Sequence, residues 1–136
     1  MMHMGLCDSR PRSRELVYVL LAQRAARALG ELRMHANQMT LDEAARFASE
    51  NTPRGWLRLT GATVWGEQHL YLQQPGYGTS YLIGKMEIDD ILSHKLGSGG
   101  TLRQFMDEKD AAGLIPVSLL RWELTGDRSR VPGLTE

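Results

Sequence analysis

The first strongly patterned stretch of the chain runs from Arg14 to about His35. Its residues are almost all good helix formers, with Ala and Leu dominating, and no proline intervenes before Pro53. This composition predicts one long helix. Its segment Leu16–Leu21 is apolar all round, and a helix without a polar face is normally buried between neighbours. We therefore expect this helix to have partners on more than one side.

Capping signals predict the next helix. Thr40 is followed three positions later by Glu43, so the threonine hydroxyl can accept from the first-turn amides while the glutamate reaches back to the cap amide. A second helix should run from about Leu41 to Ser49. Residues 54–73 contain glycines and β-branched side chains that weaken a helix, yet their length and spacing favour two short helices over paired strands.

The C-terminal half repeats these signals. A turn at Pro75–Gly78 precedes a helix with an apolar stripe through Ile88, Ile91, Leu92 and Leu96. A flexible hinge at Gly97–Gly100 leads to a second capping box at Thr101 and Gln104, whose short helix ends at Gly113. Pro116 opens a final helix, and Gly126 closes it.

The pattern as a whole predicts a mainly α fold, a bundle of about five to seven helices. We expect a disordered start at residues 1–13, a single helical domain at residues 14–126 and a polar tail at residues 127–136. The length of 136 residues and the 42% hydrophobic content suit one domain with a modest core. Trp56, Trp65 and Trp122 are expected to anchor that core.

Composition excludes several classes of protein. The 16 basic and 16 acidic residues balance, so nothing indicates a nucleic-acid or membrane-surface partner. No apolar run reaches the roughly 20 residues that span a bilayer, and the start lacks the order of a secretory signal. The single Cys7 cannot form an internal disulfide. We expect a cytoplasmic chain, although a signal upstream in a longer precursor would change that expectation.

Familiar catalytic motifs are missing from the sequence. The four histidines are widely spaced, with no pair at i and i+4 and no HExxH, so we expect no metal site made by this chain alone. Gly76-Tyr77-Gly78 begins like a dinucleotide fingerprint, but Tyr81 occupies the place of the third glycine. There is also no Gly-x-Ser-x-Gly elbow for a nucleophile.

The remaining chemistry lies in polar side chains that a plain core would not require. A tyrosine hydroxyl or an imidazole can donate to a developing oxyanion, so His35 or a tyrosine could serve hydrolysis beside a metal that is supplied elsewhere. Tyr77 shares a helical face with Tyr81, and it joins Lys85 and Arg121 as a candidate for substrate binding. The simpler alternatives are a helix-end histidine, amphipathic tyrosine packing and a solvated arginine.

Several segments in order resemble the C-terminal region of the DUF885 family. The strongest are PGYGTSYLIGK, Pro75 to Lys85, and IPVSLLRWELTG, Ile115 to Gly126, and the resemblance spans most of residues 14–126. It implies the C-terminal part of a larger helical fold similar to zinc-dependent peptidases. The resemblance also implies that His35, in LRMH, and Tyr81, in GTSY, are catalytic residues that donate to the scissile carbonyl or its tetrahedral intermediate. The HExxH and glutamate ligands of such enzymes would precede the matching region, so zinc is implied for the full-length family and not for this chain.

Two interpretations follow. In the first, the chain is a C-terminal fragment or subunit of a zinc-metallopeptidase-like hydrolase, inactive alone, that contributes His35 and Tyr81 toward a peptide-like substrate once an upstream segment completes it. In the second, it is a stand-alone helical module that binds a protein partner or forms a homo-oligomer through the apolar helix Leu16–Leu29, without catalysis. The first interpretation expects His35 and Tyr81 to face a common open concavity.

Overall fold

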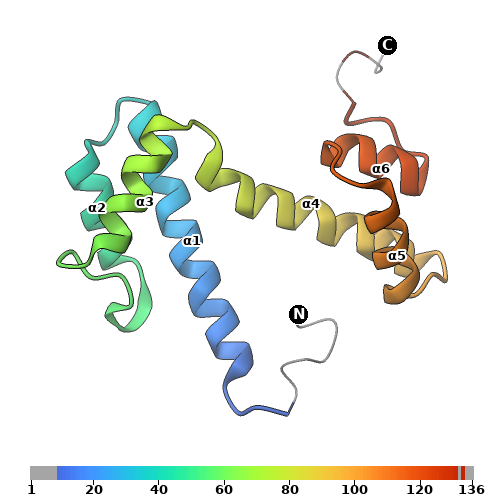
Figure 1. Ribbon diagram of the computed structural model, residues 1–136, viewed down its shortest axis with the longest axis horizontal. Coiled ribbons are helices and arrows are strands. Elements are labelled where there is room, and N and C mark those ends of the chain that lie inside the picture. The colour runs from blue at the N-terminus through green and yellow to red at the C-terminus, as the bar shows by residue number, and fades with distance from the viewer. Residues whose placement is uncertain (1–8, 132, 134–136) are drawn as a thin grey trace. The chain divides into compact units, whose positions relative to one another are not determined.

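The computed structural model describes residues 9–131 and residue 133. These residues form six α-helices and contain no strand, which confirms the mainly α fold (Figure 1). The elements, in order, are α1 (Ser13–His35), α2 (Leu41–Glu50), the 3₁₀ turn η2 (Pro53–Gly55), α3 (Ala62–Gln73), α4 (Tyr77–Gly97), α5 (Leu102–Ala112) and α6 (Val117–Thr125).

The helices divide into two compact units. The first unit extends to Ile83 and the second begins at Gly84, so α4 contributes its first turns to one and the rest to the other. The expected single domain at residues 14–126 stays a prediction. Residues 1–8, 132 and 134–136, which include Cys7, most of the expected disordered start and part of the expected polar tail, lie outside the described residues.

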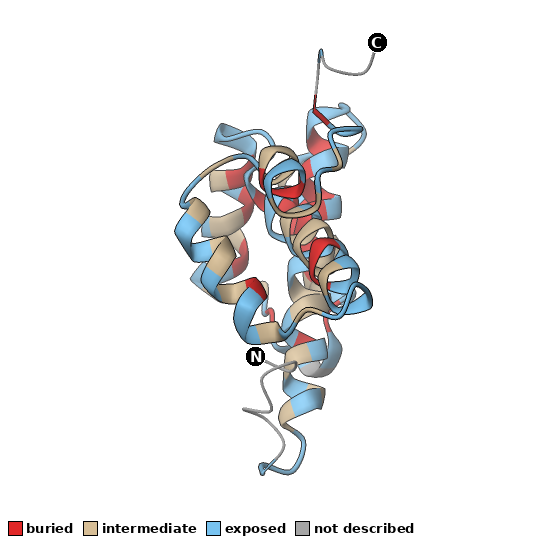
Figure 2. Ribbon diagram, turned by 90° about the vertical axis from the view of Figure 1, so that its right-hand side faces the viewer, coloured by how far each residue is buried: buried red, intermediate tan, exposed pale blue. Residues whose placement is uncertain are grey.

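In the first unit, α1, α2 and α3 pack against one another. The core between them contains the small side chains of Ala26, Ala45 and Ala48, together with Leu57 and Val64. Small residues allow helix backbones to approach closely, so α1 and α3 can bring their polar groups within bonding distance. Buried and exposed positions alternate along these helices (Figure 2).

The capping box of α2 is confirmed. The Thr40 hydroxyl accepts from the Glu43 N–H at 3.2 Å, and the Glu43 carboxylate accepts from the Thr40 N–H at 2.8 Å. Residues 54–73 differ from expectation, because they contain only one α-helix after the η2 turn. The segment between η2 and α3 is irregular, and Trp65 Nε1 donates to the Leu59 carbonyl in it at 2.7 Å.

Two expectations about burial were wrong. Leu16, Tyr18 and Leu20 are exposed, because the N-terminal turns of α1 extend beyond α2 and α3 (Figure 1). Trp65 packs against the first core as expected, but Trp56 is 45% exposed and Trp122 41% exposed. Both indoles lie at the edge of their units, where a large ring can be half covered without filling a core.

The second unit has its own core. Ile91 and Leu92 of α4 meet Phe105 of α5 and Leu120 of α6, with further partly buried apolar residues around them. The predicted capping box of α5 is present, and Gly126 ends α6 in the left-handed conformation, with φ 76°. None of the described helices combines the length and the apolar character needed to cross a bilayer.

Candidate functional site

A polar face on α1 is the main feature that the sequence analysis missed. Arg24, Arg27, Glu31 and His35 are spaced by three, four and four residues, so they lie along one side of the helix. Arg27 is only 5% exposed and Glu31 only 1% exposed. Charged residues are almost never fully buried unless they are paired. This helical spacing of charges inside an apolar helix was the signal that could have revealed the site.

Glu31 binds the N-terminus of α4. Its carboxylate accepts from the main-chain N–H groups of Gly78 at 3.2 Å and Thr79 at 2.7 Å. These amides belong to the first turn of α4, where N–H groups have no partner within the helix and the helix dipole favours a negative charge. The buried carboxylate therefore fixes the start of the helix that carries the candidate tyrosines.

Arg27 is held by α3. Its guanidinium pairs with the Glu67 carboxylate at 2.5 Å, and Gln68 Nε2 donates to the Arg27 carbonyl at 3.3 Å. Gln68 is fully buried, and neither Gln68 Oε1 nor Arg27 Nε has a hydrogen-bond partner among the described residues. Buried polar atoms are usually paired, so these two atoms are exceptions at the interface between α1 and α3.

Three tyrosines form a row across α3 and the start of α4. The ring centroids are 5.9 Å apart between Tyr71 and Tyr77, and 5.6 Å apart between Tyr77 and Tyr81. The Tyr77 and Tyr81 hydroxyl oxygens lie 3.2 Å apart in a hydrogen bond in which either hydroxyl can be the donor. Tyr71 is buried, whereas Tyr77 and Tyr81 are 40% and 42% exposed. The row thus ends in two accessible phenols.

The surroundings of Tyr77 and Tyr71 favour the protonated form of these two phenols. The hydrogen bond with Tyr81, and then the electrostatic influence of that residue, raise the pKa of Tyr77 above its ordinary value of 10.0. Burial, followed by the negative charge of Glu67, raises the pKa of Tyr71. A neutral phenol retains its O–H proton and can donate a hydrogen bond. Tyr77 is therefore a hydrogen-bond donor at neutral pH.

His35 lies against the end of α3. Its Nε2 is 3.0 Å from the carbonyl oxygen of Tyr71, so the contact places the ring proton on Nε2. The helix cannot satisfy that carbonyl itself, because the residue four positions later is Pro75, which has no N–H. His35 therefore ties the C-terminus of α1 to the C-terminus of α3 while its other ring nitrogen points away from this bond. Its catalytic role stays a prediction.

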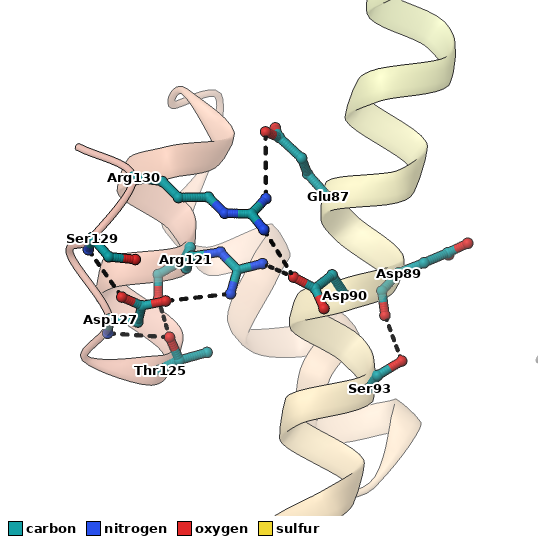
Figure 3. Close-up of polar contacts among 9 residues, drawn as sticks. All are labelled: Glu87, Asp89, Asp90, Ser93, Arg121, Thr125, Asp127, Ser129 and Arg130. Atoms are coloured by element: carbon teal, nitrogen blue, oxygen red, sulfur yellow. Dashed lines mark hydrogen bonds and ion pairs between the residues drawn. The ribbon is translucent and has the colours of Figure 1, made fainter. Parts of the chain in front are cut away.

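Lys85 and Arg121 lie in the second unit and form ion pairs there. Lys85 pairs with Asp89 of the same helix. The buried Arg121 side chain pairs with Asp90 and, at 3.5 Å, with Asp127 (Figure 3).

The same network continues through Arg130. Its guanidinium lies 3.7 Å from the Asp90 carboxylate and 4.0 Å from that of Glu87 (Figure 3). Hydrogen bonds from the Ser129 side chain and N–H, and then the charge of Arg121, lower the pKa of Asp127. Arg121 thereby attaches the segment after α6 to α4, and substrate binding by Lys85 and Arg121 stays a prediction.

Two shallow hollows occur in the first unit. One of about 390 Å³ is lined by the loop from Gly55 to Thr63, and one of about 380 Å³ lies at the start of α1 beside Trp56. Neither is lined by His35 or Tyr81. The candidate donors therefore lie on an exposed face in this structure rather than in either hollow.

The described residues form a helical protein in which Arg27 and Glu31 of α1 are buried, while the phenols of Tyr77 and Tyr81 are accessible. Residues 1–124 match a family described as "Bacterial protein of unknown function (DUF885)". The chain belongs to the DUF885 family. No curated protein and no solved structure matches the chain.

The zinc that the resemblance implies for the full-length family does not fit the described residues. Among them, no group of three or more His, Cys, Asp or Glu side chains is arranged to hold a metal ion. Two acids lie beside the polar face of α1, the buried Glu31 and the partly exposed Glu67. Glu31 already accepts from main-chain amides, and Glu67 already pairs with Arg27.

Proposed function

We propose that the first unit forms the substrate-side wall of a peptidase-like hydrolase of the DUF885 family. The observation that carries the proposal is the pair of accessible hydroxyls of Tyr77 and Tyr81, 3.2 Å apart and mounted on a helix start that a buried carboxylate fixes. A fixed pair of neutral O–H donors suits the oxygen of a peptide carbonyl, whose negative charge grows as a nucleophile adds to its carbon.

Each residue has a distinct part in this proposal. When the carbonyl oxygen takes the place of the bond between the two hydroxyls, Tyr77 and Tyr81 both donate to it and to the tetrahedral intermediate, in place of water molecules that would have to reorient. Loss of one such donor typically costs about 10²–10³ in rate. His35 holds the end of α3 and hence the Tyr71 carbonyl beside the row. The attacking water, its activation and any metal are supplied by groups other than the described residues.

The test uses an uncharged mimic of the tetrahedral intermediate. A short peptide trifluoromethyl ketone hydrates to a neutral gem-diol, and its binding to the 136-residue chain is compared with that of the parent peptide amide by calorimetry. We expect the mimic to bind at least about tenfold more tightly, which corresponds to one hydrogen bond of about 1.4 kcal/mol. The Tyr77→Phe and Tyr81→Phe double variant, which keeps both rings, should lose that preference.

Tyr18→Phe serves as the matched control, because Tyr18 is an exposed tyrosine on α1. It should leave the preference unchanged. Equal binding of the mimic by the wild type and the double Phe variant would remove the phenols from the proposal.

A second proposal rests on the exposed apolar side chains of α1. Leu16, Leu20 and Leu32 are all at least 44% exposed, which suits self-association of the helix. In this alternative the chain is a stand-alone module that forms a homo-oligomer without catalysis. We expect its mass in analytical ultracentrifugation to rise with concentration, and Leu20→Glu to abolish that rise. A constant monomer mass for the wild type would refute the alternative.

A further inference from the structure

The guanidinium of Arg24 lies over the ring of Tyr81, with its central carbon 4.4 Å from the ring centroid. Such a contact is favourable because the face of an aromatic ring is electron-rich. It also restricts a long side chain that would otherwise sample many rotamers. The structure therefore holds a positive charge beside the accessible phenols.

No carboxylate among the described residues pairs with Arg24. The neighbouring acids on this face are already occupied, because Glu67 binds Arg27 and the buried Glu31 binds the amides of α4. Arg27, by contrast, is buried and is paired with Glu67. Arg24 is exposed, so its N–H groups are accessible to a ligand.

A guanidinium presents a rigid fork of N–H donors that matches the two oxygens of a carboxylate. Beside it, the hydroxyls of Tyr77 and Tyr81 are donors without a charge. This combination suits a ligand that carries an anionic group next to a neutral carbonyl. Such a ligand is a peptide with a carboxylate close to the peptide bond whose carbonyl the phenols bind.

We propose that Arg24 is a carboxylate-recognition residue, so that the substrate class of this face is a peptide with a carboxylate adjacent to the carbonyl bound by the phenols. The inference rests on the proposed function and adds the charge of the substrate to it. The carboxylate can come from a free C-terminus or from an acidic side chain, because both present the same two oxygens.

Arg33 provides a matched control. It lies on the same helix and also over an aromatic ring, at 5.1 Å from the centroid of Phe47, but that ring has no hydroxyl. If stacking of an exposed arginine were sufficient, Arg24 and Arg33 would contribute alike. The proposal requires Arg24 alone to matter.

The experiment titrates the 136-residue chain with three short peptides by calorimetry or NMR. One peptide has a free C-terminal carboxylate, the second is its C-terminal amide, and the third is an amide with a glutamate near its C-terminus. We expect one or both anionic peptides to bind about tenfold or more tightly than the neutral amide, as a charge-assisted bond predicts. Which of the two gains affinity identifies the source of the carboxylate.

Arg24→Gln should remove the preference for the anionic peptides, and Arg24→Lys should retain only part of it, because an ammonium lacks the fork. Arg33→Gln should leave it intact. A preference that survives Arg24→Gln, or no binding of any of the three peptides, would overturn the inference.

The two roles fail separately in these measurements. The phenol role is measured with the uncharged mimic, on which Arg24→Gln should have little effect. The arginine role is measured by the ratio of anionic to neutral peptide, which the Tyr77→Phe and Tyr81→Phe double variant should leave unchanged because the Tyr81 ring survives. If the wild-type chain prefers the mimic but not the anionic peptides, the role of Arg24 is wrong. If it prefers the anionic peptides but not the mimic, the role of the phenols is wrong.

Discussion

The carboxylate of Glu31 on α1 accepts the main-chain N–H of Thr79 at 2.7 Å, in the first turn of α4. Glu31 is 1% exposed, and the two residues are 48 positions apart in the sequence. A side chain from one helix thus completes the N-terminus of another and, with it, the position of Tyr77 and Tyr81. Any function of the phenols depends on this contact.

Removal of that carboxylate should destabilise the chain. Glu31→Ala leaves the amides of Gly78 and Thr79 buried without an acceptor, at about 1–3 kcal/mol each. We expect a loss of roughly 2–5 kcal/mol in the free energy of unfolding, measured by urea denaturation with circular dichroism. Glu31→Gln should lose less, because one amide oxygen remains to accept.

Glu50→Ala is the control for that series, since Glu50 is exposed at the end of α2. Its effect should stay within about 0.5 kcal/mol, as for most surface changes. If Glu31→Ala and Glu50→Ala had the same effect, the buried contact would contribute nothing to stability.

Gly78 and Gly84 should respond in opposite ways to alanine. A Cβ at Gly78 would lie 2.7 Å from two ring carbons of Tyr71, so Gly78→Ala should cost about 1–3 kcal/mol by overpacking. A Cβ at Gly84 of the same helix would meet nothing within 4 Å. Gly84→Ala should stabilise by about 0.4–1 kcal/mol, because alanine has less freedom to lose on folding. Thermal unfolding of the two variants provides the comparison, and a neutral Gly78→Ala would contradict the close approach of α4 to Tyr71.

The pKa of Tyr77 should depend on Tyr81. In Tyr81→Phe the hydroxyl contact is gone, so the pKa of Tyr77 should fall toward the unperturbed value of about 10. A raised folded-state pKa contributes stability that is present below the unfolded value and is lost as the pH rises through the folded one. NMR titration of the labelled phenol carbon measures the change, and an unaltered Tyr77 pKa in the variant would disprove the coupling.

Asp127 should make the attachment of the segment after α6 sensitive to acid. Its folded-state pKa lies below the unfolded value of about 3.9, so its contribution is present above that value and is lost as the pH falls through the folded one. Asp127→Asn should therefore destabilise α6 near neutral pH, and the difference from wild type should vanish in acid. Hydrogen exchange of the α6 amides, corrected for intrinsic rates, reports this.

The control for the acid effect is Asp107→Asn. Asp107 is an exposed residue of α5 that lies 3.7 Å from Arg103. Its substitution should leave α6 unchanged at every pH. A gap between wild type and Asp127→Asn that persists in acid would assign the effect to something other than the charge.

Several features could be predicted from the sequence because they are local. The capping boxes at Thr40 and Thr101 join residues three positions apart, and Gly126 ends its helix through its own backbone conformation. The mainly α fold and the DUF885 resemblance follow from long runs of residues in order. The two helices expected in residues 54–73 were wrong, because composition alone did not show that the segment before α3 is irregular.

The sequence by itself therefore determined the helices, most of their ends and the family, since hydrogen bonds within a helix or its cap reach only three or four residues. Tertiary structure decided that Glu31 meets the first turn of α4, that Arg27 meets Glu67 and that His35 meets the Tyr71 carbonyl. The reason is physical. These partners are brought together by the packing of α1 against α3 over a core of small side chains, and the geometry of that packing depends on all the contacting residues at once.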